Sequence, residues 1–330
     1  MNDKRQLLQQ IKDITEKLEN GTRDIFTNGR YEQYLKTMSK FHKYSTHNTM
    51  LIHMSNENST MVAGFTTWQL KFDRHVRKGE KAIKIFAPIT VTSVKKVLKI
   101  DPKTKKAVLK DGFPVYEEIE VKIPKFKVVS VFDISQTEGK PLPLLTESLT
   151  GDVKDYDLLM EALKMVSKYP IIYEDLDPGT DGLYYFDNRI CIRRGMSETQ
   201  TVSAVVHELA HSFLHTAQEL AQGASLAAIK TAEVEAESVS YTVCQYFDIE
   251  TSRNSFGYLA EWSRSKELKE LTSSLETIRK TSSMLIESIE SALEEAGRRR
   301  GNYDRAERAM AKRSLFSLLM ESLDDQEECS

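Results

Sequence analysis

The feature that most constrains this chain is a pair of histidines set four residues apart in an apolar run. Residues 205–215 read VVHELAHSFLH, so His207, Glu208 and His211 have the spacing H-E-x-x-H. On an α-helix, residues four apart lie on one face, where both imidazoles can bind one metal ion. Glu208, one position along, can then reach a water molecule on that ion and act as a general base. We therefore predict a helix that carries a zinc site.

A chance match is the alternative interpretation, because a motif with three fixed letters recurs in unrelated proteins. The residues around the motif argue against chance, since they would bury the helix and a buried His or Glu needs a partner. These apolar neighbours are Val205, Val206, Leu209, Ala210 and Phe213. Ser197 is a plausible N-cap for this helix, and Thr201 is the alternative.

A catalytic zinc ion needs a third protein ligand and one open position. Twenty-one residues lie between His211 and Glu233, enough for a helix end, a loop and a new helix. Glu233 and Glu237 would share one face of that helix, whereas Glu235 points away. We expect Glu233 to bind zinc and Glu237 to accept the free N–H of a ligand histidine, with the reverse assignment open. A solvated acidic face is the alternative, which the apolar stripe beside these glutamates disfavours.

His215 extends the face of His207 and His211 by one further turn. On a continuous helix it would lie about 5–6 Å beyond His211 along the axis. We therefore expect His215 next to the zinc ligands or in the core, with direct metal binding as the alternative.

The composition is that of an ordinary globular protein. The 330 residues suffice for two domains, and 40% of them are hydrophobic and 29% charged. No apolar run has membrane-spanning length and the N-terminus is not a signal peptide, so we expect no membrane partner. Cys191, Cys244 and Cys329 are too few and too scattered for a disulfide framework. We therefore expect a reducing, cytoplasmic location.

The first 60 residues have helical patterns. Apolar residues at helical spacing predict one helix over residues 4–20, stopped by Gly21, and a second helix from Tyr31. Ser45 or Thr46 would cap a third helix.

Residues 62–132 are strand-rich and basic. Strand patterns cover residues 82–89 and 128–132, with two strand-like runs in 91–127. The segment 91–127 contains ten lysines and five acidic residues. Cations for phosphates, interleaved with aromatic rings for unstacked bases, suit single-stranded nucleic acid. The alternative is a solvated sheet edge whose lysines discourage aggregation.

The second half has mainly helical patterns around a few short strands. Residues 138–152 contain two prolines, two glycines and no periodicity, which predicts an interdomain linker. The elements expected before the zinc helix are a helix at 156–167 and strands near 171–173, 182–186 and 189–192. A long helix to about residue 295 follows the glutamate helix. The chain therefore has an α+β pattern with two domains, the second mainly helical with a small sheet.

Five sequence blocks in a fixed order carry a family resemblance. The first three are YSxxNxxLI from Tyr44, VAGFxxW from Val62 and VRKGEKAIxIFAP from Val76. The other two are HELAH at 207–211 and EVEAESVSY at 233–241. With these blocks the chain resembles the ArdC-like antirestriction family of plasmids and integrative conjugative elements.

The resemblance covers most of residues 30–265 and implies a two-part protein. It implies an N-terminal domain that binds single-stranded DNA and a zincin-like metallopeptidase domain related to the ImmA/IrrE group. We therefore divide the chain into a DNA-binding domain at 1–137, a linker at 138–152, a peptidase domain at 153–265 and a C-terminal helical extension at 266–330, which lies outside the resemblance.

The resemblance also implies site residues. Zinc would be bound by His207, His211 and Glu233, with Glu208 as the general base. Charge and aromaticity then suggest the contacts with DNA, which are Trp68, Arg74, Arg77, Lys78 and Lys81. Trp68 fits the core equally well.

Three functions follow from these features. The first is a cytoplasmic zinc metallopeptidase tethered to a single-stranded-DNA-binding domain, acting on an unknown protein substrate during entry of a mobile element. The second is a non-catalytic protein that protects single-stranded DNA and whose zinc is structural. The third is a regulatory protease that cleaves a repressor. In a peptidase, Tyr241 or Tyr258 would stabilise the oxyanion.

Overall fold

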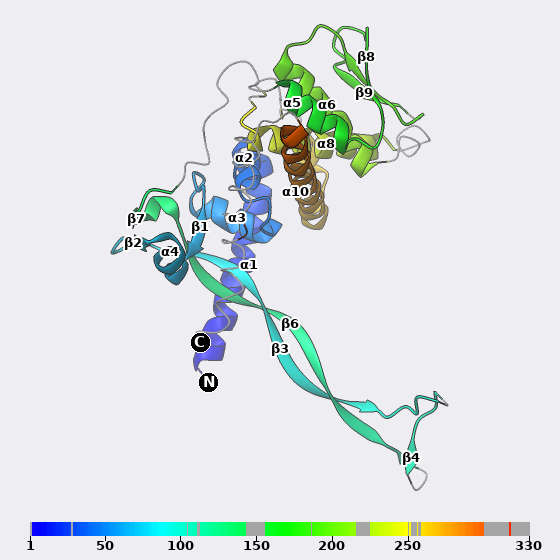
Figure 1. Cartoon of the computed structure of the whole chain (residues 1–330). Helices are drawn as coiled ribbons and strands as arrows, with labels where there is room; N and C mark the ends of the chain where they lie inside the picture. The colour runs from blue at the N-terminus through cyan, green and yellow to red at the C-terminus, as the bar shows by residue number, and fades with distance from the viewer. Residues whose placement is uncertain are drawn as a thin grey trace.

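The computed structural model describes most of the chain. The described residues are 2–27, 29–103, 105–110, 113–142, 156–185, 187–215, 225–249, 251, 256, 259–299 and 317. They form an α+β structure, as predicted, with a group of helices, two three-stranded sheets and a long two-stranded ribbon (Figure 1).

Helices open the chain. They are α1 (Asn2–Thr27), α2 (Tyr31–Lys40) and α3 (Thr46–Ser55). Ser45 caps α3 by accepting the N–H of Asn48, which selects one of the two predicted caps. The predicted stop at Gly21 is wrong, because α1 continues through it. Gly21 instead allows α1 to approach α3, since a Cβ there would collide with the thioether of Met54.

An antiparallel sheet of order β1-β6-β3 follows the helices. Its strands are β1 (Val62–Gly64), β3 (Ile83–Leu98) and β6 (Tyr116–Asp133). Strands β3 and β6 pair continuously, from Ile83 opposite Val131 to Leu98 opposite Tyr116. The predicted division of this span into several shorter strands is therefore wrong. The alternation of buried and exposed residues fades along β3 because neither face is covered there, so the sequence pattern weakens while the backbone pairing continues.

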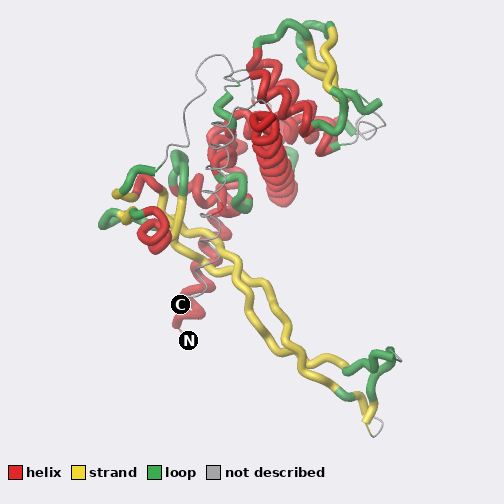
Figure 2. The backbone as a smooth tube through the Cα atoms, viewed as in Figure 1, coloured by secondary structure: helices red, strands yellow, loops and turns green. Residues whose placement is uncertain are grey.

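The far half of this hairpin extends away from the helices as a two-stranded ribbon. We call residues 89–125 the arm; Figure 1 shows it leaving the helices, and Figure 2 shows its paired strands in yellow. Short elements at the tip and at the base complete the N-terminal half. These are β4 (Leu109–Lys110), β5 (Phe113–Pro114), α4 (Phe65–Phe72), β2 (Arg74–Val76), the 3-10 turn η1 (Ile134–Gln136) and β7 (Thr137–Gly139).

The second half packs helices beside a small sheet. The elements are α5 (Tyr156–Val166), β8 (Ile171–Glu174), β9 (Gly182–Tyr184), β10 (Ile190–Arg193), α6 (Glu198–Leu214), α8 (Leu226–Tyr246), α9 (Leu259–Arg264) and α10 (Leu268–Arg299). Strand β10 lies in the centre, parallel to β8 and antiparallel to β9. The three strands and the long helix occur where the sequence predicts them, although α10 continues past residue 295.

One hydrophobic core runs through both halves. The buried apolar residues of the N-terminal helices and of α5, α6, α8 and α10 form a single cluster. Polar contacts reinforce the junction: Tyr31 Oη lies 2.8 Å from Ser238 Oγ, which joins α2 to α8. Glu276 of α10 accepts hydrogen bonds from Thr46 and from Arg279. The N-terminal helices therefore support the helix that carries Glu233.

The domain boundaries remain predictions. Glu138 and Gly139, inside the predicted linker, belong to β7, which pairs with β2. Residues 143–152 of that linker lie outside the described residues, as does most of the chain beyond residue 299. Helix α10, in the predicted C-terminal extension, packs against α5 and α8.

Two further expectations concern membranes and thiols. None of the described helices is long and apolar enough to cross a membrane. Cys191 and Cys244 are buried free thiols, while Cys329 lies outside the described part of the chain.

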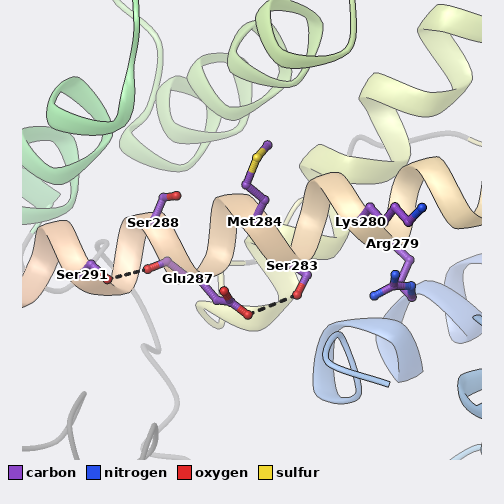
Figure 3. A pocket seen from close by; sticks show the side chains of 7 residues that line it. All are labelled: Arg279, Lys280, Ser283, Met284, Glu287, Ser288 and Ser291. Atoms are coloured by element: carbon purple, nitrogen blue, oxygen red, sulfur yellow. Dashed lines mark hydrogen bonds between the residues drawn. The ribbon is translucent and has the colours of Figure 1, made fainter. Parts of the chain in front are cut away.

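An open pocket lies along one face of α10 (Figure 3). It is lined by Arg279, Lys280, Ser283, Met284, Glu287, Ser288 and Ser291. All these side chains come from α10, and Ser283 donates a 3.4 Å hydrogen bond to Glu287. One carboxylate without any histidine in this lining is a poor donor set for a metal ion, so the predicted chemistry lies elsewhere.

Asn48 fixes the base of the long hairpin to α3, and its removal is expected to destabilise the fold. Its Nδ2 donates to the Phe86 carbonyl and its Oδ1 accepts the Phe86 N–H, both at 2.8 Å. Asn48→Ala removes both partners from a part-buried peptide, so we expect the unfolding free energy to fall by about 2 kcal/mol. Urea denaturation measures this, with the exposed Asn58→Ala as the unaffected control. Equal midpoints for the two variants would contradict the assignment.

Candidate metal centre and nucleic-acid surface

The predicted metal helix is α6, and a capping box fixes its start. Ser197 accepts the N–H of Gln200, and the Gln200 side chain accepts the N–H of Ser197. The apolar residues around the motif bury the helix as predicted, and His211 and Glu208 are only 5% and 6% exposed. The polar groups of the motif therefore need partners inside the protein.

His207, His211 and Glu233 converge from α6 and α8. The two Nε2 atoms lie 3.1 Å apart, and oxygens of Glu233 lie 3.7 Å from His207 Nε2 and 3.5 Å from His211 Nε2. Tetrahedral zinc with nitrogen ligands at about 2.0–2.1 Å would hold its donor atoms about 3.3 Å apart. The ligand atoms of these three residues all lie within 4.8 Å of one another. The donor set therefore fits a single divalent ion.

Glu237 contacts the opposite side of the His207 ring. Its Oε2 lies 3.2 Å from His207 Nδ1. A carboxylate at Nδ1 holds a proton there and leaves Nε2 free for a metal ion. This geometry favours Glu233 over Glu237 as the third ligand.

Opposite charges meet in the donor set. Burial lowers the pKa of His207, but hydrogen bonds with Glu233 and Glu237 outweigh this effect and raise the pKa to about 10. The hydrogen bonds from His207 and His211 hold the pKa of Glu233 far below its usual value. A divalent ion must displace the proton of His207, so metal binding releases protons.

Strand β9 lies against the side chain of Glu208. Burial raises the pKa of Glu208, and the backbone N–H of Tyr184 hydrogen-bonds to its carboxylate. A Cβ on Gly182 would lie 2.8 Å from both Cγ and Oε1 of Glu208, so only glycine leaves room for the carboxylate. The sequence analysis did not identify Gly182 or Tyr184 as site residues. A glycine inside a strand pattern is the available signal, since it often marks a close approach of the backbone.

His215 lies beside the donor set in a different way from the one predicted. Helix α6 ends at Leu214, and His215 is its C-cap with extended backbone, so it does not add another helical turn. Its ring centroid lies 5.9 Å from that of His211, and the residue is half-buried.

The prediction that Tyr241 stabilises an oxyanion is wrong. Tyr241 follows Glu233 by about 12 Å along α8. Its buried ring packs against Phe256, with centroids 5.6 Å apart. The alternative, Tyr258, lies outside the described residues.

The residues predicted to contact DNA divide into buried and exposed groups. Trp68 is fully buried and donates its Nε1–H to the Phe132 carbonyl at 2.9 Å, so the prediction that it stacks on a base is wrong and its core role holds. Arg74 donates to the hydroxyl and carbonyl of Thr137 and to the Lys140 carbonyl, which ties the chain after β7 to β2.

Arg77, Lys78 and Lys81 are exposed near one surface groove. Arg77 donates to Glu80 at 2.6 Å and to the Ser135 carbonyl at 2.7 Å, so its guanidinium is partly engaged within the protein. The groove is lined by residues that include Lys17, Arg77 and Lys81. Lysine ammonium groups at such a groove suit phosphates.

The fold and the donor set define a candidate metal-binding protein with an α+β N-terminal part. Residues 5–132 match the family model described as the N-terminal domain of the anti-restriction factor ArdC. Residues 5–132 therefore belong to the family of the ArdC N-terminal domain, as the sequence resemblance indicated.

The chain is also similar to a bacterial protein and to two crystal structures. An uncharacterized protein of Bacillus anthracis is 30% identical over 293 residues, which cover 80% of this chain and 48% of the relative. The chain thus spans about half the length of that relative. Crystal structures of antirestriction ArdC from plasmid R388, metal-free and Mn(II)-bound, are each 17% identical, with TM-scores of 0.44 and 0.45. These alignments cover 78% and 76% of this chain and 86% and 85% of the ArdC chains.

Removing the Glu237 carboxylate is expected to weaken metal binding. Glu237→Ala leaves His207 Nδ1 without the acceptor that orients the ring, so zinc affinity should fall about 10–100-fold. Competition with a chromophoric chelator measures the affinity. Glu235→Ala, on the same helix and bonded instead to Ser274, is the control that keeps parent affinity. Equal affinities for Glu237→Ala and the parent would contradict the orienting role.

Proposed function

We propose that this chain is a zinc-dependent metallopeptidase joined to an N-terminal domain that binds single-stranded DNA. It would serve antirestriction or the maintenance of a mobile element. The observation that carries the enzymatic part is the convergence of His207, His211 and Glu233 next to the buried carboxylate of Glu208.

The donor set supports zinc as the ion. Two imidazoles and one carboxylate are the protein ligands of many catalytic zinc sites, which keep the fourth position for water. When bound, zinc polarises a carbonyl and lowers the pKa of that water. Nε2 of His207, Nε2 of His211 and a carboxylate oxygen of Glu233 would hold it.

We propose that Glu208 moves the protons of peptide hydrolysis. Its burial raises the pKa of the carboxyl group, which suits a group that must both accept and return a proton. The Tyr184 N–H and the close backbone of Gly182 fix the carboxylate in place. Glu208 would take a proton from water and pass it to the leaving amine.

The small sheet supports an extended peptide as the substrate class. Strand β9 is the last strand in the order β8-β10-β9 and packs against α6, which carries the motif. An edge strand of this kind can bind a peptide by backbone pairing. We therefore propose an unfolded or extended segment of a protein as the substrate.

The groove near Lys78 and Lys81 supports the DNA-binding part. Lys78 and Lys81 are exposed, and Lys17 and Arg77 add positive charge to the groove lining. The match of residues 5–132 to the ArdC N-terminal domain supports the same assignment.

Glu208→Gln is expected to keep zinc and to lose peptidase activity. The amide has the same shape but takes no proton, so cleavage should fall about 10²–10⁴-fold. Zinc content by mass spectrometry and cleavage of a mixed peptide library measure the two effects. His211→Ala is the companion variant and should lose both zinc and cleavage. Cleavage by Glu208→Gln at the parent rate would exclude Glu208 as the base.

Lys78→Glu combined with Lys81→Glu is expected to weaken binding of single-stranded oligonucleotides. Each lost phosphate contact should reduce the slope of log affinity against log salt by about 0.7. Fluorescence anisotropy over a salt series measures the slope. Arg264→Glu with Lys269→Glu makes the same charge change on exposed residues of the other half and is the control. An equal loss in both variants would point to net charge instead of the groove.

A further inference from the structure

The outer edge of β6 carries no partner strand along the arm. One side of β6 pairs with β3 over its length, while the other side pairs with β1 at residues 131–133 alone among the described strands. Residues 116–130 thus present a row of backbone N–H and C=O groups to solvent (Figure 1). Such an edge is a template for another strand.

Two hydrogen bonds establish which residues of β6 direct their backbone N–H and C=O groups away from β3. Lys99 donates its N–H to the Val115 carbonyl, so odd-numbered residues of this strand face β3. Ile134 donates its N–H to the Met61 carbonyl on the β1 side, so even-numbered residues face outward. A second strand would therefore form its hydrogen bonds with the even-numbered residues. Pro124 sits at one of these outward positions, where it breaks no bond with β3 but removes one N–H donor from the outer edge.

The sequence of β6 is complementary to itself around Val121. Residues 116–126 read YEEIEVKIPKF, with carboxylates before Val121 and ammonium groups after it. An antiparallel copy centred on Val121 would place opposite charges and like apolar groups together. The pairs would be Tyr116 with the partner subunit's Phe126, Glu117 with the partner subunit's Lys125, Ile119 with the partner subunit's Ile123, Glu120 with the partner subunit's Lys122, and Val121 with the partner subunit's Val121. The remaining pair, Glu118 with the partner subunit's Pro124, has no such match and lacks one hydrogen bond. This register also joins even-numbered with even-numbered residues, as the outward hydrogen bonds require.

Three charges of β6 find no such match within the described residues, whereas Glu117 and Glu118 form salt bridges with Lys99 and Lys96. Glu120 lies opposite Val94, Lys122 opposite Thr92 and Lys125 opposite Ile89. All three charged side chains are exposed, and none forms a salt bridge within the described residues. Their alternation is therefore unexplained by the pairing of β6 with β3.

The exposed apolar residues of β6 also indicate a partner strand. Ile119 is 38% and Ile123 40% exposed on one face of the arm. A two-stranded ribbon is marginally stable alone, whereas further strands give an apolar face the neighbours it needs.

We propose that a second copy of this chain pairs with the outer edge of β6, antiparallel and centred on Val121. The two arms then form one four-stranded sheet of order β3-β6-β6-β3 in a symmetric dimer. This inference goes beyond the proposed function and does not depend on it.

A charge swap tests the register in the full chain. Glu120→Lys or Lys122→Glu alone would set like charges opposite each other twice in the dimer, and dimer affinity should fall about tenfold or more. The double variant restores opposite charges and should recover parent affinity. Sedimentation equilibrium over a concentration series measures the monomer of 37.7 kDa against its dimer. A parent that stays monomeric, or a double variant weaker than both single variants, would overturn the proposal.

A disulfide tests the twofold axis separately. Val121 would face its own copy in a non-hydrogen-bonded pair with Cα atoms about 4.5 Å apart, which a disulfide can bridge. Val121→Cys should therefore cross-link under mild oxidation, in a Cys329→Ser background. Ile119→Cys is the matched control, because it would lie four residues, about 13 Å, from its own copy and should not cross-link. Cross-linking of Ile119→Cys but not Val121→Cys would overturn the register.

Both tests separate this proposal from the proposed function. Apart from the Cys329→Ser background, each variant changes arm residues outside the donor set and outside the groove near Lys81, so zinc content should equal that of the parent. If the parent is monomeric and Lys122→Glu weakens oligonucleotide binding, the arm binds nucleic acid and the dimer proposal falls. If the dimer forms and no peptidase activity is found, the dimer stands and the peptidase proposal falls.

Discussion

The structure depends on the burial of polar donors on α6. His211 and Glu208 lose nearly all contact with water, and the free-energy cost of that burial must be offset by neighbouring charges. Glu233 and Glu237 supply negative charge to the two imidazoles from α8, and His207 and His211 favour the charged form of Glu208. The Tyr184 N–H supplies one more contact from β9. The site therefore fixes α6, α8 and β9 relative to one another. Its chemistry and its contribution to the fold come from the same contacts.

This arrangement explains why the two halves share a core. Helix α8 must be held rigidly if Glu233 is to meet two imidazoles, and α8 is covered by α6 on one side and by α2 and α10 on others. The bond between Tyr31 and Ser238 lies beside Glu237, because Ser238 is the next residue of the same helix. The N-terminal helices thus form part of the support of the donor set, in addition to any contact with DNA.

The sequence predicted the metal helix, its cap and the convergence of His207, His211 and Glu233, because helical spacing and buried polar residues are local signals. It also predicted the strands near β9, because strand patterns are local signals as well. It misjudged features that depend on distant neighbours. Trp68 is an aromatic residue in a basic segment, which suggested stacking on a base. The hydrogen bond to the Phe132 carbonyl and the surrounding core determine its position instead. The arm was divided into pieces because exposed strands lack a clear alternation, and Gly21 was taken as a stop because Met54, its neighbour in space, is 33 positions away in the chain.

The contact of Gly21 with Met54 makes the packing of α1 on α3 sensitive to oxidation. The thioether occupies the space that the missing side chain of Gly21 leaves, so an oxygen added on the side of α1 would meet that helix. Methionine sulfoxide is larger and polar, and it disrupts packed interfaces. Oxidative damage at this sulfur would separate two helices at the base of the arm, far from any metal ligand. A methionine sulfoxide reductase would then act as a repair enzyme for the fold.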